Sequence, residues 1–436
     1  MTVTRRFLFL NVPGLVLAGG SPWLPDLFVL ALAYHAAILL LAVSDAVFGH
    51  AANAVTATRH VGPKLSLGDE THIEVEVSNL STWPVSVSMV DQPPEEFRFE
   101  AAGGDLRLPP RARMTLRYDV TPPERGTFTF GDLWLRVACR MGLASRRIRI
   151  PAAQEVRVYP NLAGIRRAEL LGRKNRLAEV GIHRVRVAGQ GTEFEQLREY
   201  SPDDDYRRIN WKATAKRSKP TTMDYQLERS QTVLLCVDAG YLMGTELGWM
   251  TKLDVAINAG ALLAHAALSG GDRVGLVVFS HRIVAHVTPA HGSGQMNRMM
   301  EALQAVRPEA TRVDYLSLVK FLAIHGKRRS LLAIFTDLVD TRVGDELVRA
   351  LKLLRARHLP LCLTFRDEQA EALSRSRPDT VDDVYTQAVA MELARDRTRV
   401  LGDLARQGAH VVDTRPDELS IQAVNAYLAI KARQVL

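Results

Sequence analysis

Two apolar stretches at the start of the chain restrict its fold more than any other feature. No Asp, Glu, Lys, Arg or His occurs from Phe7 to Pro25, and His35 is the only such residue from Leu27 to Ser44. As a helix, the 18 positions of the second stretch span roughly 27 Å at about 1.5 Å per residue, close to the hydrocarbon thickness of about 30 Å. Residues 1–50 are therefore predicted to form a membrane hairpin with two transmembrane segments, at about 7–25 and 27–48.

The first stretch also fits a re-entrant or interfacial segment, because Asn11, Pro13 and the Gly19-Gly20 pair interrupt it. A second alternative starts from Thr4-Arg5-Arg6, which together with the apolar residues after it is similar to a twin-arginine export leader. The anchor-like second stretch argues against a removed leader.

Basic residues flank the hairpin on the same side. Arg5 and Arg6 precede the first stretch, the loop between the stretches has none, and the next ones are Arg59 and Lys64. An excess of cations marks the cytoplasmic side of a membrane segment. The chain has only three cysteines, which is typical of a reducing compartment. We therefore expect a protein of the inner (cytoplasmic) membrane whose soluble domains face the cytoplasm.

Residues 51–160 show the alternation of half-buried strands. Ile73, Val75 and Val77 alternate with polar neighbours, and Pro-Pro and Gly-Gly pairs separate the runs. Three further runs follow the same pattern: Val85, Val87 and Met89; Met114, Leu116, Tyr118 and Val120; Leu133, Leu135 and Val137. The prediction is an immunoglobulin-like β-sandwich that serves as a spacer or docking surface.

Residues 161–231 are predicted to be a basic linker followed by a charged signature segment. From Arg146 to Arg186 the chain has eleven basic residues and three acidic ones. Such a run fits contact with an anionic membrane leaflet. Nucleic acid is an unlikely partner, since Tyr159 is the only aromatic residue among these cations that could stack on a base.

The signature segment runs from Gly191 to Gln231 and contains eight acidic and eight basic residues. This balance indicates either an internal network of ion pairs or an exposed interaction face. The predicted interaction residues are Glu193, Arg198, Glu199, Tyr200, Asp204, Asp205, Arg207, Arg208, Asn210, Trp211 and Lys212.

This segment resembles the bacterial and archaeal family called domain of unknown function 58. The resemblance rests on Glu193-Phe194, Leu197-Arg198-Glu199-Tyr200, Pro202, Asp204-Asp205, Arg207, Ile209-Asn210-Trp211-Lys212 and Ala215. Family members usually carry Gly after the Pro, where this chain has Asp203, so the turn there is expected to differ. The resemblance implies a membrane-anchored protein with a von Willebrand factor A-like domain and a MoxR-type AAA+ ATPase as partner.

Residues 232–436 alternate strands with helices, which predicts an α/β (Rossmann-like) domain with a parallel sheet covered on both faces. Strands are expected at 232–238, 273–280, 330–337, 359–365 and 410–413. Helices are expected near 295–305, 315–325 and 343–357, and from residue 416 onward. Asp238 and Asp337 then fall at the carboxyl ends of strands, where such sheets bind ligands.

Domains similar to von Willebrand factor A hold a divalent cation at this edge with a D-x-S-x-S motif, a Thr and a T-D-G strand end. By that resemblance the ligand positions are Asp238, Gly240, Leu242, Thr311, Asp314 and Asp337, and strict register places Val313 at the threonine's position. Both serines are missing. Because Mg²⁺ needs oxygen ligands in near-octahedral geometry, we expect a degenerate site without a cofactor.

Other catalytic motifs are missing from the sequence. There is no Walker G-x-x-x-x-G-K-[ST] and no G-x-S-x-G, and the spacing of His281, His286 and His291 fits neither a helix face nor a strand face. The lack of these motifs favours a protein without catalytic residues. Together with the family resemblance, which implies the ATPase as partner, it leads us to expect a non-enzymatic adaptor that docks the ATPase or other protein complex subunits.

One alternative to the adaptor is a divalent-cation-dependent hydrolase or phosphate-handling enzyme built on Asp238, Asp314 and Asp337. The other is a surface adhesion receptor, against which the cation distribution and the few cysteines argue.

Overall fold

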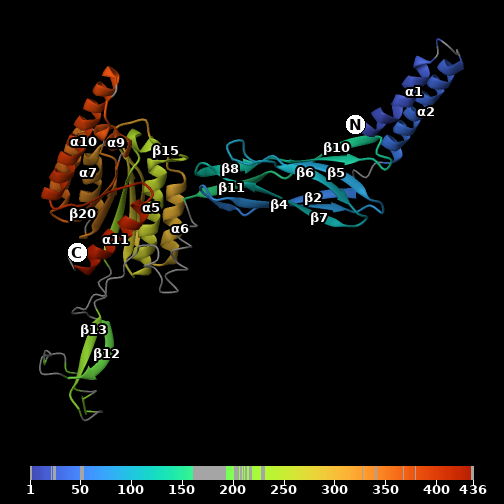
Figure 1. Ribbon diagram of the computed structural model, residues 1–436. Helices are drawn as coiled ribbons and strands as arrows, with labels where there is room; N and C mark the ends of the chain where they lie inside the picture. The colour runs from blue at the N-terminus through green and yellow to red at the C-terminus, as the bar shows by residue number, and fades with distance from the viewer. Residues whose placement is uncertain are drawn as a thin grey trace. The chain divides into compact units, whose positions relative to one another are not determined.

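The computed structural model (Figure 1) describes residues 2–20, 22, 26–49, 54–160, 193–200, 206, 209, 211, 214–215, 219–226, 231–326, 328–338, 341–366, 368–378 and 380–433. The chain consists of two compact units, Met1–Tyr159 and Pro160–Leu436.

The first unit begins with a pair of apolar helices, α1 (Arg5–Gly19) and α2 (Asp26–Phe48). By length and composition α2, with 23 residues, can cross a membrane. Its bounds agree with the predicted second segment. The other helix, α1, has 15 residues, contains Pro13 and spans only roughly 22 Å. It ends at Gly19, whereas the predicted segment ran to about residue 25; residues 21 and 23–25 lie outside the described residues.

The two helices touch closely at Gly14. A Cβ atom on Gly14 would lie 2.7 Å from Cδ1 of Tyr34 and 2.8 Å from Nδ1 of His35, so only glycine fits there. The Tyr34 hydroxyl donates a 2.8 Å hydrogen bond to the carbonyl oxygen of Leu10. The first apolar helix therefore packs against the second at Gly14, next to the predicted interruption at Pro13.

Three sheets form the rest of the first unit. The first sheet has the spatial order β1 (Thr2–Val3), β10 (Ala144–Ile150), β9 (Leu133–Ala138), β5 (Val85–Val90) and β6 (Gly103–Leu108). The second sheet has the order β3 (Lys64–Ser66), β11 (Gln154–Tyr159) and β8 (Gly126–Phe130). The third sheet has the order β2 (Val55–His60), β4 (Thr71–Asn79) and β7 (Arg113–Val120). All pairings are antiparallel except that of β11 with β3.

The alternation read from the sequence is confirmed in these strands. Ile73, Val75 and Val77 of β4 are buried, as are the predicted inward residues of β5 and β9. In β7 only Tyr118 and Val120 are buried, while Met114 is exposed near the start of the strand.

The second unit is built on a six-stranded sheet. Its strands, in spatial order, are β18 (Ile283–Ala290), β17 (Arg273–Phe279), β14 (Thr232–Asp238), β19 (Leu331–Phe335), β20 (Leu359–Phe365) and β21 (His410–Thr414). Five strands are parallel, as predicted, and β18 pairs antiparallel with β17. The prediction of a purely parallel sheet was wrong at this edge, because the turn between β17 and β18 is too short for a crossover.

Helices cover both faces of this sheet (Figure 1). On one face lie α5 (Lys252–Ser269), α6 (Ser293–Gln304) and α11 (Leu419–Ala432), and on the other lie α7 (Tyr315–His325), α8 (Thr341–Leu354) and α10 (Val381–Arg406). The short helix α9 (Glu368–Arg375) packs on α10. Neither α9 nor α10 was predicted. The three cysteines are free and buried, as expected of small core residues.

Candidate functional site

Two buried carboxylates, Asp238 and Asp337, mark the carboxyl edge of the sheet in the second unit. Asp238 ends β14, and Asp337 follows the neighbouring strand β19. The strand that follows β14 in the chain, β17, pairs with one side of β14, and the later strand β19 pairs with its other side. The two aspartates therefore lie at a topological switch point of the sheet, where the strand order reverses. The structure therefore brings together the two residues at the centre of the predicted site.

The Asp238 carboxylate is held by protein donors. Its Oδ1 accepts a 2.7 Å hydrogen bond from the Gly240 backbone N–H, and its Oδ2 accepts one of 2.7 Å from the Thr336 hydroxyl. The pKa of Asp238 is raised to about 6, mainly by burial and in part by the nearby charge of Asp337, while the two hydrogen bonds act in the opposite direction. A Cβ atom on Gly240 would lie 3.1 Å from Oδ1 of Asp238, so a side chain there would crowd this carboxylate.

The Asp337 carboxylate is occupied by a cation of the protein itself. The Lys252 ammonium donates a 2.6 Å hydrogen bond to Oδ2 of Asp337, and the Leu338 backbone N–H donates one of 2.8 Å to Oδ1. Both side chains of this ion pair are buried. Lys252 is the first residue of α5, and a capping box between Thr251 and Asp254 fixes the start of that helix.

The other predicted ligand positions have different roles. Asp314 is the N-cap of α7 and accepts a 2.9 Å hydrogen bond from the Leu316 backbone N–H. The Thr311 hydroxyl is 2.9 Å from Oγ of Ser280, and the Thr311 carbonyl oxygen accepts a hydrogen bond from the Tyr241 backbone N–H. Leu242 offers no oxygen from its side chain.

These residues do not fit Mg²⁺, which needs several oxygen ligands around one point. The ammonium of Lys252 lies against Asp337, and positions 242 and 313 carry apolar side chains. No group of three or more His, Cys, Asp or Glu residues among the described residues is placed to hold a metal ion.

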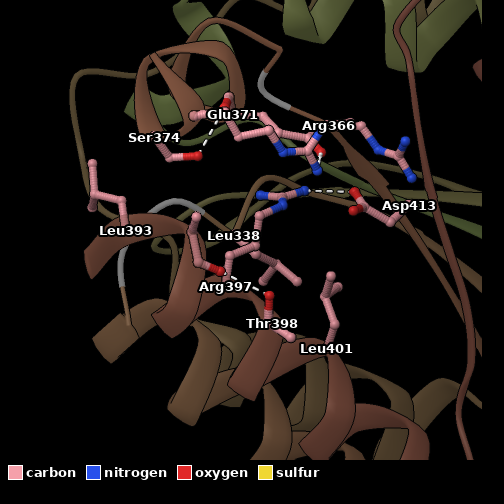
Figure 2. Close-up of a pocket in the computed structure, with 11 residues that line it drawn as sticks. Leu338, Arg366, Glu371, Ser374, Leu393, Arg397, Thr398, Leu401 and Asp413 are labelled. Carbon is pink, nitrogen blue, oxygen red and sulfur yellow. Dashed lines mark hydrogen bonds and ion pairs between the residues drawn. The ribbon is translucent and has the colours of Figure 1, made fainter. Parts of the chain in front are cut away.

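A pocket of about 320 Å³ opens beside Asp337, between α9, α10 and the ends of β20 and β21 (Figure 2). Arg397 of α10 lies at its centre, with Nη1 3.7 Å from Oδ1 of Asp337 and Nη2 2.7 Å from Oδ1 of Asp413. Glu371 and Arg375 of α9 form a second ion pair in the wall, with 2.6 Å between oxygen and nitrogen. The pocket therefore extends the charged network from the sheet edge to α9 and α10.

Apolar side chains project from the first half of α10. Five of them are more than half exposed, and we call them the α10 face: Val381, Val384, Tyr385, Val389 and Met391, with exposed fractions of 72%, 52%, 70%, 56% and 55%. Leu373 of α9 is also exposed. Monomeric soluble proteins rarely expose a contiguous apolar surface of this kind unless it binds something.

The signature segment is described only in part. Its ends form an antiparallel hairpin of β12 (Glu193–Glu199) and β13 (Thr221–Gln226), in which Arg198 pairs with Thr222 and Glu199 with Thr221. The Tyr200 backbone N–H donates a 2.9 Å hydrogen bond to the Pro220 carbonyl oxygen. Trp211 is 70% exposed. Six predicted residues lie outside the described residues: Asp204, Asp205, Arg207, Arg208, Asn210 and Lys212.

Sequence reasoning missed Lys252 and Arg397, and it did not assign a hydrogen-bond partner to Thr336. Lys252 had a detectable signal, since it is the only charge other than Asp254 in an otherwise apolar helix. The threonine before Asp337 belongs to the motif already examined. Arg397 gave no signal, because α10 contains several arginines and acids whose partners depend on the tertiary fold.

The fold and this site define a class of protein: a β-sheet unit that carries an apolar helix pair, joined to an α/β unit with a charged network at its sheet edge. Residues 196–410 match the model of the family described as "Protein of unknown function DUF58". Over these residues the chain belongs to that family, which confirms the resemblance drawn from the signature segment.

Uncharacterized proteins of Mycobacterium tuberculosis and Mycobacterium bovis are each 26% identical to this chain over 233 residues, which is 52% of this chain and 71% of the relative. Among solved structures, the conserved hypothetical protein BatB from Bacteroides thetaiotaomicron is 14% identical with a TM-score of 0.31, over 47% of this chain and 99% of that one. The CARDB domain of the PF1109 protein from Pyrococcus furiosus is 15% identical with a TM-score of 0.18, over 24% of this chain and 91% of that one.

Proposed function

We propose that this chain is a non-enzymatic, membrane-anchored adaptor whose von Willebrand factor A-like α/β unit docks a MoxR-type AAA+ ATPase, or a client complex of that ATPase, during assembly or maturation. The α10 face is the observation that carries this proposal. Its valines, tyrosine and methionine form an apolar surface on a projecting helix, and aromatic residues and methionine are enriched where proteins bind one another.

Membrane anchoring is supported by α2, which is long and apolar enough to cross a bilayer. The cations that flank the helix pair favour a cytoplasmic position for both flanks under the positive-inside rule. We therefore propose the inner membrane as the location, with both units on the cytoplasmic side, where an AAA+ ATPase has access to ATP.

A binding role is also supported by the two carboxylates at the sheet edge, whose oxygens already have partners within the protein. Hydrolysis through a divalent cation requires open carboxylate oxygens, and the Lys252 ammonium already occupies Oδ2 of Asp337. Asp238 uses both of its oxygens to accept hydrogen bonds from Gly240 and Thr336. No contact in this network favours the hydrolase alternative.

The test is affinity purification of the detergent-solubilised full-length chain, with and without nucleotide, as wild type and as the double variant Tyr385→Glu, Val389→Glu. We expect the wild type to recover an AAA+ ATPase in a nucleotide-dependent manner. The variant should recover at least about tenfold less ATPase than the wild type. Two charges placed in a central apolar contact should reduce the binding free energy by more than about 1.4 kcal/mol.

The matched control is Leu353→Glu on α8, which places a charge at another position that is 60% exposed. Both variants should fold, since substitutions at exposed positions usually change stability by about 0.5 kcal/mol or less. Equal recovery of the ATPase by wild type and double variant would refute docking at the α10 face. If the wild type recovers no ATPase but associates with itself, and the double variant does not, the partner of the α10 face is a second copy of the chain and not the ATPase.

A further inference from the structure

We propose that the base of the helix pair, where α1 and α2 join the first β-sheet, is a binding site for the phosphate group of anionic phospholipids. The site consists of Arg6, Arg140 and Trp83 together with the turn from Cys139 to Ala144, which we call the basal turn. The inference rests on the membrane anchoring proposed above and concerns a surface that the docking of a protein partner does not use.

The basal turn is fixed rigidly to the end of α2. The Asp45 carboxylate accepts hydrogen bonds from the backbone N–H groups of Met141, Leu143 and Ala144, at 2.8, 3.0 and 3.3 Å. The Arg140 backbone N–H donates a 2.8 Å hydrogen bond to the carbonyl oxygen of Gly49, directly after the helix. The position of the turn along the membrane normal therefore follows from the position of α2.

The start of the chain is attached to the same place. Strand β1 pairs with β10, and the Thr4 hydroxyl donates a hydrogen bond to the Gly142 carbonyl oxygen. Arg6 consequently lies against the turn: its Nη1 is 3.1 Å from the position that a Cβ atom on Gly142 would occupy. The first turn of α1 and the last turn of α2 thus meet at one level.

That level matches the lipid headgroups. The 23 residues of α2 span roughly 34 Å, a little more than the hydrocarbon core of about 30 Å, so the last turn lies at the membrane interface. Phe48 is 84% exposed and Met141 is 54% exposed, which suits the boundary between acyl chains and headgroups.

The cations at this level are available to an external anion. The Arg140 guanidinium lies 5.6 Å from the centre of the Trp83 ring, and Arg6 is exposed. Neither arginine forms an ion pair with an acidic side chain in the part of the chain that the structure describes. Asp45, the acid that touches the turn, already accepts three hydrogen bonds and is buried.

This arrangement selects a phospholipid by its chemistry. A guanidinium binds phosphate oxygens through two parallel N–H groups, and a tryptophan beside it suits the interface between water and hydrocarbon. A zwitterionic lipid carries a compensating ammonium group, so an anionic lipid gains more from the two arginines on this turn.

The test uses the full-length chain in non-ionic detergent, incubated with equal amounts of phosphatidylglycerol and phosphatidylcholine that have the same acyl chains. Native mass spectrometry then counts the lipids retained. We expect the wild type to retain phosphatidylglycerol about tenfold over phosphatidylcholine. In the double variant Arg6→Gln, Arg140→Gln, the ratio of retained phosphatidylglycerol to phosphatidylcholine should be at least about fivefold lower than in the wild type.

The control variant, Arg113→Gln with Arg117→Gln, removes the same charge from β7, where each arginine pairs with a glutamate, and should keep the preference. An equal loss in the control would show that net charge, and not this site, selects the lipid, which overturns the inference. Displacement of the lipid by inorganic phosphate would also overturn it, because the site would then be one for free phosphate.

Extraction of membranes with alkaline carbonate separates this inference from the anchoring proposal. If the wild type leaves the membrane, the anchoring proposal fails and the lipid site fails with it. If the wild type stays in the membrane but shows no lipid preference, the lipid site alone is refuted. We expect wild type and both variants to stay.

Discussion

At the scale of single residues, Lys252 determines the chemistry of the sheet edge. Its ammonium is buried against Asp337, so the pair is stable only as long as both charges are present. Removal of one partner of a buried ion pair is costly because the other charge remains without compensation. The lysine is therefore a built-in counterion at the sheet edge where parallel sheets bind ligands.

Replacement of Lys252 by methionine should destabilise the second unit by about 3 kcal/mol, since Asp337 would keep only the Leu338 N–H and the more distant Arg397. The measurement is denaturant unfolding of the full-length chain. Lys320→Met, at an exposed position of α7, is the control and should change stability by less than about 0.5 kcal/mol. An increase in the melting temperature of the wild type with millimolar Mg²⁺ would contradict the counterion role.

The titration of Asp238 leads to a second prediction. Its pKa is raised from 3.8 to about 6 on folding, so between these values the folded chain binds more protons than the unfolded chain. Stability therefore falls as the pH rises through this range, by roughly 3 kcal/mol at most, and stays lower above pH 6. Asp238→Asn removes the titrating group while its side-chain oxygen can still accept the Gly240 hydrogen bond.

We thus expect the melting temperature of Asp238→Asn to exceed that of the wild type at pH 7.5 and to approach it near pH 4. Thermal unfolding of both proteins over this range measures the difference, in which other titrating groups cancel. A constant difference across the range would show that Asp238 does not titrate there.

At the scale of elements, the connection between α2 and the basal turn depends on one side chain. Asp45→Ala would leave three backbone N–H groups without their acceptor, and each buried donor of this kind costs about 1–3 kcal/mol. We expect trypsin to cleave after Arg140 at least about tenfold faster in Asp45→Ala than in the wild type. Asp45→Asn, which retains one acceptor oxygen, should lie between the two. Equal cleavage in all three would show that the turn is held by other contacts.

The elements also show what the sequence could predict. The strands Thr232–Asp238 and Leu359–Phe365 and the helix Tyr315–His325 were predicted to the residue, because each is an apolar run between clear boundaries. The edge strand β18 was not recognised, since its alternation is weak and His286 and Pro289 interrupt it. The helices α9 and α10 were missed because their sequences are mostly polar, and α10 buries few of its residues, among them Ala390, Val400 and Leu404.

The candidate site was predictable only as far as its motif extended. Asp238 and Asp337 could be placed together, because the ends of neighbouring parallel strands meet at one edge. Their partners could not be placed. Lys252 approaches from a helix that follows a different strand, and Arg397 comes from 60 residues further along the chain than Asp337. Such contacts depend on how the helices pack, which periodicity does not specify.

At the scale of the whole molecule, the pairing of β1 with β10 has a consequence for how the protein is made. Thr2 and Val3 pair with Ser145 and Ala144, which lie about 140 residues further along the chain. Because a chain is made from its N-terminus, β1 stays without its strand partner until β10 has been synthesised. The first sheet of this unit therefore closes only near the end of the unit's synthesis, after both apolar helices have been made.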